Sequence, residues 1–337
     1  EIMPSLVGSE MCIRDRYRRL GQRGPMVSSI GYGCMGLSHG YGKVPEREES
    51  VRLIAKAFEL GCTFFDTAEV YGAGHNEALV GEAVASFRDK IVLATKFFYH
   101  SSEGDAKSCI RRHLEASLQR FGTDHVDLYY QHRVEENEKV EEIAEVMGEL
   151  IEEGLIGGWG QSQSTADQIR RAHHVTPLTA IQSEYSMMER QCEESVIPTC
   201  EELGIGFVAF SPLASGFLSG KYNESTQYAG DDVRRVITRF DRDNVRANQP
   251  LLDLLGHFAQ SKNVTLAQIS LAWMLKKKDF IVPIPGMRRD ERIIENLAAA
   301  DVELTDTEFA AIEAELAKIK IYGNRTDADI AKLRDMQ

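Results

Sequence analysis

The 337-residue sequence lacks a long apolar run, a paired cysteine motif and a block of positive charge. No stretch resembles a signal peptide or is long enough to span a membrane, so we expect neither secretion nor a membrane partner. The six cysteines show neither CxxC spacing nor metal-ligand spacing, which predicts no metal site and a reducing, cytoplasmic location. The formal net charge of -13 argues against nucleic acid as a partner.

Short apolar segments alternate with amphipathic segments along most of the chain. This alternation predicts an α/β fold with parallel strands and crossover helices, and the number of strands favours a closed (β/α)8 barrel. A doubly wound sheet is the alternative, but the first turn, Gly31 to Gly36, lacks the GxGxxG spacing of a dinucleotide-binding unit. The expected strands are Ser29 to Gly33, Cys62 to Asp66, Ile91 to Lys96, Val126 to His132, Gly157 to Ser162, Ala180 to Glu184, Gly206 to Ser211 and Ile281 to Pro285.

We expect residues 17–337 to form a single domain. Residues 1–16 show no clear period and are interpreted as a disordered or artefactual extension. Residues 17–28 predict a small β-hairpin that plugs the bottom of the barrel, and the long connection 211–281 is of a length that usually covers a site. Residues 305–318 predict an extra C-terminal helix, and we expect the polar tail beyond it to be frayed.

Polar side chains stand where several predicted strands end. Asp66, Lys96 and His132 each occupy the carboxyl end of a strand, and Tyr71 follows in the loop after Asp66. The strand ends of a barrel converge on one face, where active sites lie. Alone, Asp66 or Tyr71 has an ordinary interpretation as a cap or turn residue and His132 as a rim histidine. Lys96 is more informative, because a solvated lysine would more often lie in the following loop. The hypothesis therefore rests on their joint placement.

This combination of side chains suits proton donation to a carbonyl oxygen. A tyrosine hydroxyl, with an ordinary pKa of about 10, is a weak acid at neutral pH, and a nearby ammonium group favours its deprotonated form. Lys96 would supply that charge, Asp66 would keep Lys96 protonated, and His132 would orient the substrate oxygen. No side chain donates hydride, so the reaction requires a cofactor.

The chain resembles the aldo-keto reductase superfamily from Tyr17 to about Asn324. The motifs that carry the resemblance are GCTFFDTAEVYG (61–72), VLATKF (92–97), VDLYYQHR (126–133), QSEYS (182–186), FVAFSPLASGFLSGKY (207–222) and VPIPGMRRDERIIEN (282–296). The resemblance implies a TIM barrel and NADPH-dependent reduction of small aldehydes or ketones. It also implies a catalytic tetrad of Asp66, Tyr71, Lys96 and His132, with Tyr71 as proton donor.

The resemblance also implies contacts to NADP(H) along the barrel face. They fall on Gly33, Cys34, Met35, Asp66, Ser162, Gln163, Gln182, Phe210, Ser211, Pro212, Leu213, Ser215, Gly216, Lys221, Gly286, Arg288, Arg292, Glu295 and Asn296. The spacing of Arg288 and Arg292 independently lets both guanidinium groups converge on one phosphate, although a solvated helix face explains it equally well. The chain departs from the family pattern at Gln163, Phe210 and Met287.

Other functions remain open on the sequence. The physiological reaction is either carbonyl reduction or oxidation of an alcohol or sugar, and a nicotinamide-binding regulatory or scaffold subunit is the rival from another class. A barrel hydrolase would need paired carboxylates such as Asp66 and Glu184, but Lys96 beside Asp66 suits that chemistry poorly. We expect Tyr41, Phe97, Phe98, Tyr99 and Arg133, with parts of the long connection, to line the substrate pocket.

Overall fold

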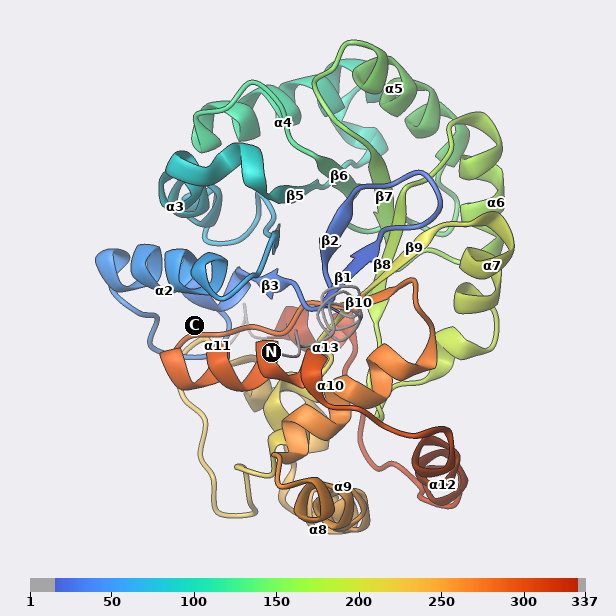
Figure 1. The fold of residues 1–337 in the computed structure, drawn as a ribbon. Helices are drawn as coiled ribbons and strands as arrows, with labels where there is room; N and C mark the ends of the chain where they lie inside the picture. The colour runs from blue at the N-terminus through green and yellow to red at the C-terminus, as the bar shows by residue number, and fades with distance from the viewer. Residues whose placement is uncertain (1–15, 333–337) are drawn as a thin grey trace, which may run out of the picture.

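A computed structural model describes residues 16–332 and shows a parallel barrel surrounded by helices (Figure 1). The eight-stranded sheet has the order β10-β9-β8-β7-β6-β5-β4-β3, so neighbours in sequence are neighbours in space. The strands are β3 (Tyr32–Gly33), β4 (Phe64–Asp66), β5 (Val92–Phe97), β6 (Leu128–Gln131), β7 (Trp159–Ser162), β8 (Ala180–Glu184), β9 (Gly206–Phe210) and β10 (Ile281–Pro283). Each lies within or next to a predicted strand, which confirms the predicted barrel fold.

The first and last strands meet and close the barrel. The amides of Gly31 and Gly33 donate to the carbonyl oxygens of Pro283 and Pro285, at 2.9 and 3.1 Å. Gly33 also forms a parallel bridge with Gly286. A Cβ on Gly33 would lie 2.7 Å from the carbonyl oxygen of Ile284, so this close approach requires glycine.

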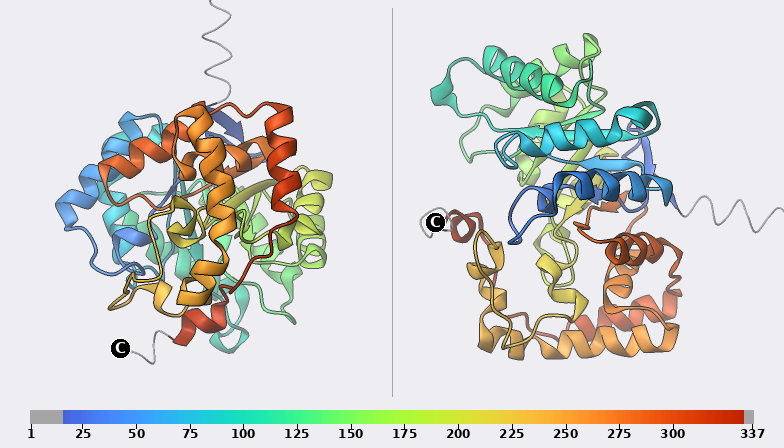
Figure 2. Two further views of the ribbon diagram at one scale, coloured as in Figure 1. Left: turned by 90° about the horizontal axis from the view of Figure 1, so that it is seen from below. Right: turned by 90° about the vertical axis from the view of Figure 1, so that its left-hand side faces the viewer.

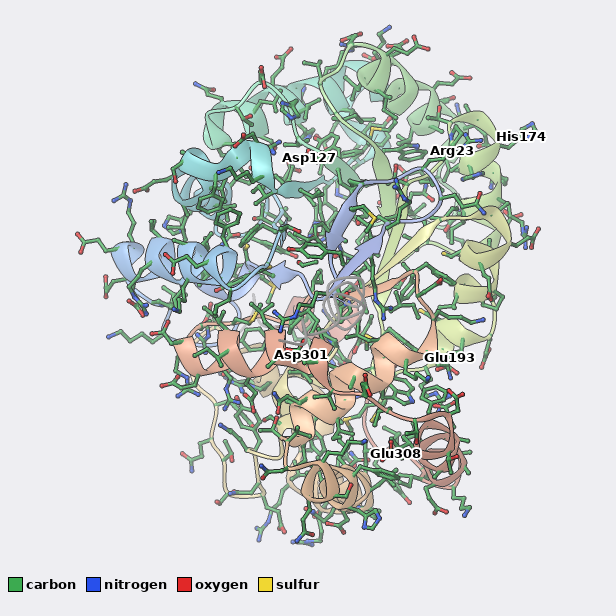
Figure 3. The ribbon with its side chains drawn as sticks, viewed as in Figure 1. Arg23, Asp127, His174, Glu193, Asp301 and Glu308 are labelled. Atoms are coloured by element: carbon green, nitrogen blue, oxygen red, sulfur yellow. The ribbon has the colours of Figure 1, made fainter. Side chains whose placement is uncertain are left out.

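The predicted hairpin closes one end of the barrel. Strands β1 (Tyr17–Arg19) and β2 (Met26–Ser28) pair antiparallel, and Leu20 and Val27 pack with barrel-interior residues such as Leu128. Figure 3 shows Arg23 and Asp301 on this side of the molecule. Arg16, the last residue of the predicted extension, donates to Asp301 at 2.7 Å, while residues 1–15 lie outside the described part of the chain.

Helices follow the strands and pack around the barrel. Side-chain caps fix several of their starts: Asp105 accepts from the amide of Ser108, and Thr165 and Thr265 form capping boxes with glutamines three residues on. The α-helices are α2 (Arg47–Glu59), α3 (His75–Val84), α4 (Ala106–Phe121), α5 (Val140–Glu152), α6 (Ala166–Val175), α7 (Val196–Leu203), α8 (Arg242–Ala247), α9 (Gln249–Lys262), α10 (Leu266–Lys277), α11 (Asp290–Leu297), α12 (Asp306–Leu316) and α13 (Asp327–Ala331). The 3-10 helices are Met35–Leu37, Ala85–Lys90, Ser101–Glu103, Gln191–Glu193, Ala214–Ser219, Val233–Arg235, Thr238–Phe240 and Ala298–Asp301. Among the described residues, no helix is long and apolar enough to cross a membrane.

The described part of the C-terminal tail is ordered where we expected it to be frayed, while residues 333–337 lie outside the described residues. Beyond α12 the chain runs to α13, which lies at the end of the barrel opposite the hairpin in both views of Figure 2. Arg325, just before α13, is held by an ion pair to Glu184 at the end of β8. The sequence did not predict this contact, because an ion pair holds the tail and the tail has no periodic apolar pattern that would indicate packing.

We predict that Leu20→Ala destabilises the protein by about 2–5 kcal/mol, because it leaves a cavity in the plug of the barrel. Met26→Ala is the matched control in the same hairpin, since Met26 is 48% exposed and its loss should change the unfolding free energy by about 0.5 kcal/mol or less. Urea unfolding measures both. Equal effects of the two substitutions would contradict the assignment of Leu20 to the plug.

Candidate active site

The four residues of the predicted tetrad lie together at the end of the barrel opposite the hairpin. Asp66 ends β4, Lys96 lies near the end of β5, and His132 directly follows β6. Tyr71 reaches the same place from the loop before α3. Its ring centroid lies 5.2 Å from the Lys96 Nζ and 5.8 Å from the imidazole centroid of His132. The tertiary structure therefore assembles residues that are up to 66 positions apart in the chain.

Lys96 is fully buried and is held by oxygen acceptors. Its ammonium group donates to a carboxylate oxygen of Asp66 and, at 2.7 Å, to the carbonyl oxygen of Thr67. The other carboxylate oxygen of Asp66 accepts from the Gln182 amide at 2.9 Å. Burial is the largest single influence and lowers the pKa of Lys96, but Asp66 and Tyr71 together outweigh it, so the pKa lies above its ordinary value. Lys96 therefore places a positive charge beside Tyr71 at neutral pH.

His132 is a neutral imidazole at neutral pH. Burial, reinforced by the charges of Lys96 and Arg133, lowers its pKa well below 6.5. Its Nδ1 has no hydrogen-bond partner among the described residues. The ring packs against Phe98, with centroids 4.6 Å apart. Its neutral ring leaves His132 able to bond a ligand oxygen without adding charge.

Asn76 fixes the loop that carries Tyr71, and no pattern in the sequence pointed to this residue. Its backbone amide donates to the carbonyl oxygen of Tyr71 at 3.2 Å. Its buried side-chain amide donates to the carbonyl oxygen of Cys34 at 3.0 Å and to the Ser38 hydroxyl at 2.7 Å. The Thr67 hydroxyl completes the network by donating to the Asn76 side-chain oxygen. One side chain thus ties the Tyr71 loop to the neighbouring loop after β3.

A second network fixes Phe98 against His132. One carboxylate oxygen of Glu69 accepts from the Phe98 amide at 2.9 Å, and the other contacts His113 Nδ1 at 2.7 Å. The hydrogen bond to Glu69 raises the pKa of His113 above 6.5, against the opposing effect of burial. Glu69 and His113 therefore help to hold the Phe98 ring against His132.

A cavity of about 690 Å³ opens beside this cluster of side chains. Its walls come from the loop after β3, the loop after β9 and the segment that joins β10 to α11. Most of the predicted cofactor residues in the second half of the chain line it, namely Ser211, Pro212, Leu213, Ser215, Gly216, Lys221, Gly286, Arg288, Arg292 and Asn296. The cavity is also lined by residues that were not predicted from the sequence as cofactor contacts, among them Lys43, Tyr222, Arg234 and Arg289.

The loop after β9 adopts an unusual backbone conformation. Ser211, Ala214 and Ser215 have positive φ angles of 49°, 49° and 56°, and Gly216 follows at 93°. Non-glycine residues rarely adopt such angles, and a group of them commonly marks a functional loop. The loop forms one wall of the cavity.

Polar groups in the cavity suit a nucleotide that carries phosphate. Arg288 donates to the carbonyl oxygen of Lys43 at 3.0 Å, whereas Arg292 is held in an ion pair by Glu295. Asn296 is 1% exposed, and neither its amide nitrogen nor its amide oxygen has a partner among the described residues. A buried amide without partners is costly, so Asn296 is poised for a ligand that bonds both atoms.

The remaining predicted cofactor residues lie outside the cavity wall, and all of them except Glu295, which is in α11, are nearer the strand ends. Ser162, Gln182 and Phe210 end or lie near the end of β7, β8 and β9. Gln163 has a φ of 60°, and its amide donates to the carbonyl oxygen of Gln182. Gly33, Cys34 and Met35 form the turn after β3, where the Cys34 amide donates to the carbonyl oxygen of Asp66 at 2.9 Å.

Comparison with known proteins gives the family. The family model described as "Aldo/keto reductase family" matches residues 29–317. This chain belongs to the aldo/keto reductase family. "Probable aldo-keto reductase 1" of Glycine max is 38% identical over 302 residues, which cover 87% of each chain.

Solved structures of aldo/keto reductases share the fold. The glycerol dehydrogenase of Gluconobacter oxydans superposes with a TM-score of 0.82 at 25% identity, over 93% of this chain and 98% of that one. The aldo/keto reductase of Klebsiella pneumoniae was solved in complex with NADP and acetate. It superposes with a TM-score of 0.74 at 25% identity, over 93% of this chain and 99% of that one. The family assignment made from the sequence motifs is confirmed.

We predict that His113→Gln reduces stability in a pH-dependent way. The folded-state pKa of His113 is raised, so its contribution is complete below pH 6.5 and disappears as the pH rises through the raised value. The deficit of the variant, on the order of 1 kcal/mol at pH 6, should therefore shrink toward pH 9. Urea midpoints across that range measure it, with the exposed His174→Gln as control. A deficit that grows with pH would contradict the assigned ion pair with Glu69.

Proposed function

We propose that this aldo/keto reductase reduces aldehydes or ketones to alcohols with NADPH, and that Tyr71 donates the proton. The observation that carries the proposal is the buried Lys96, held protonated by Asp66, with its ammonium group over the Tyr71 ring. Such an arrangement stabilises the negative charge that develops on the Tyr71 oxygen as its proton leaves.

Bound NADPH would supply the hydride that no side chain provides. Tyr71, which is half-buried, would present its hydroxyl to the carbonyl oxygen, and His132 would donate a hydrogen bond to that oxygen. Because His132 stays neutral, Lys96 remains the cation that acts on Tyr71. Asp66 serves by keeping Lys96 charged rather than by contacting the substrate.

The residues of the cavity fit the proposed cofactor. Aldo/keto reductases use NADP(H). The unpartnered amide of Asn296 suits a nucleotide base, and Arg288 supplies a cation for a phosphate group. Ser162, Gln163, Gln182 and Phe210 lie at the strand ends next to the tetrad, where the nicotinamide end would be held.

Oxidation of an alcohol is the second candidate, because the relative from Gluconobacter oxydans is a glycerol dehydrogenase. The same side chains serve either direction, since Tyr71 would then accept the proton that it donates in reduction. A hydrolase is disfavoured, because Glu184 is held in ion pairs by Arg239 and Arg325. A purely regulatory role predicts cofactor binding without turnover.

We predict that Tyr71→Phe lowers the rate of NADPH-dependent aldehyde reduction by at least about 100-fold, because the variant lacks the proton donor. Its NADPH affinity, measured by fluorescence quenching, should change less than about threefold, since Tyr71 does not line the cofactor cavity. Tyr322→Phe, which removes a hydroxyl from an exposed tyrosine, is the control. Undiminished turnover by Tyr71→Phe would refute the role of Tyr71.

We also predict that Arg288→Gln reduces the preference for NADPH over NADH more than Arg292→Gln does. Both side chains line the cavity, but the charge of Arg292 is already compensated by Glu295. Dissociation constants for both cofactors, measured by fluorescence quenching, test this order. A larger loss in Arg292→Gln would show that Glu295 releases Arg292 when the cofactor binds.

A further inference from the structure

Two guanidinium groups lie at the mouth of the barrel, next to His132 and to the ends of β7 and β9. Arg133 follows His132 directly, and its guanidinium group donates to the carbonyl oxygen of His132 at 2.7 Å and to the Ser162 hydroxyl at 3.4 Å. Arg325 reaches the same place from the C-terminal tail. Their guanidinium carbons lie 5.9 and 5.2 Å from the ring centroid of Phe210.

Two carboxylates pair with these arginines: Glu184 with Arg325, and Asp327 with Arg133. Glu184 is buried, with 6% of its side chain exposed, and it is held by Arg239, which is 3% exposed. Asp327 is 50% exposed and contacts Arg133 through both of its oxygens, at 2.6 and 3.3 Å. The first pair is a fixed part of the barrel rim, whereas the second lies at the surface.

Asp327 also belongs to a short element. It begins α13, a helix of five residues at the C-terminal end of the described chain. An ion pair with a half-exposed partner contributes little to stability, so releasing Asp327 costs little. Its departure would leave three arginines beside two glutamates, because Glu184 and Glu189 are the other carboxylates paired with Arg239 and Arg325.

We propose that Arg133 and Arg325 bind a carboxylate carried by the carbonyl substrate, and that Asp327 occupies this site until the substrate displaces it. The side-on contact of Asp327 with Arg133 is the geometry in which a guanidinium group binds a carboxylate. The site is partly desolvated, with 26% of Arg133 and 14% of Arg325 exposed, which strengthens the pairing. The substrate class is therefore aldehydes or ketones with a second, carboxylate end.

The inference rests on the proposed reductase function, and its test separates the two. We would compare 4-formylbenzoate with its neutral methyl ester as substrates of the full chain with NADPH. The wild-type protein should give a kcat/KM at least tenfold higher for the carboxylate, mainly through a lower KM. Equal values, or a preference for the ester, would overturn the proposal.

Variants then assign the effect to its residues. Arg133→Gln and Arg325→Gln should each lower kcat/KM for the carboxylate at least fivefold more than for the ester, and Arg133→Lys should recover part of that loss. Asp327→Asn should lower the KM for the carboxylate relative to the ester. Arg170→Gln and Asp306→Asn, which break exposed ion pairs on α6 and α12, are the controls. Equal losses on both substrates would show that Arg133 only supports the backbone of His132.

Binding of the carboxylate without turnover gives an independent measurement. Isothermal titration calorimetry of 4-formylbenzoate should detect binding that is weakened in Arg133→Gln and strengthened in Asp327→Asn. That result without turnover of either aldehyde would retain the carboxylate site and reject the reductase function. Turnover of the ester without any detectable carboxylate binding would retain the reductase and overturn this inference.

Discussion

The buried ion pair between Lys96 and Asp66 is the interaction on which the rest of the site depends. Burial penalises the charged form and would lower the pKa of an isolated lysine in that position. Asp66, with Tyr71, reverses this effect, and the Thr67 carbonyl and the Gln182 amide fix the geometry of the pair. Burial keeps the neighbouring His132 neutral, and the charge of Lys96 reinforces that effect. The ion pair thus places the positive charge beside Tyr71 and favours a neutral imidazole next to it.

The barrel fold places two different surfaces beside this ion pair, a cavity and a charged rim. The loop after β9 and the segment before α11 supply the cavity that suits a dinucleotide. Arg133, Arg239 and the C-terminal tail form a charged rim next to the tetrad. Because strand ends of a barrel converge, the residues of the predicted tetrad lie between the two. In the proposed function, one side would set cofactor preference and the other substrate preference.

Much of the fold was predictable because it follows from local patterns. Apolar strands such as those that end at or near Asp66, Lys96 and His132 were recognisable from composition and spacing. The structure contains all eight of the predicted barrel strands. The networks of Asn76 and Glu69 were not recognisable, because a single buried amide or carboxylate has no periodic signal. The fold of the C-terminal tail was missed for a related reason, since ion pairs such as that between Arg325 and Glu184 join residues far apart in sequence.

The sequence by itself determined the barrel, the family and the residue types at each strand end, because these depend on short-range patterns and recognisable motifs. Only the tertiary structure decided which charges meet. It paired Arg292 with Glu295, left the side-chain amide of Asn296 without a partner among residues 16–332 and brought Asp327 onto Arg133. The physical reason is that charge states and hydrogen-bond partners depend on distance and burial in space, which the linear order of residues does not specify.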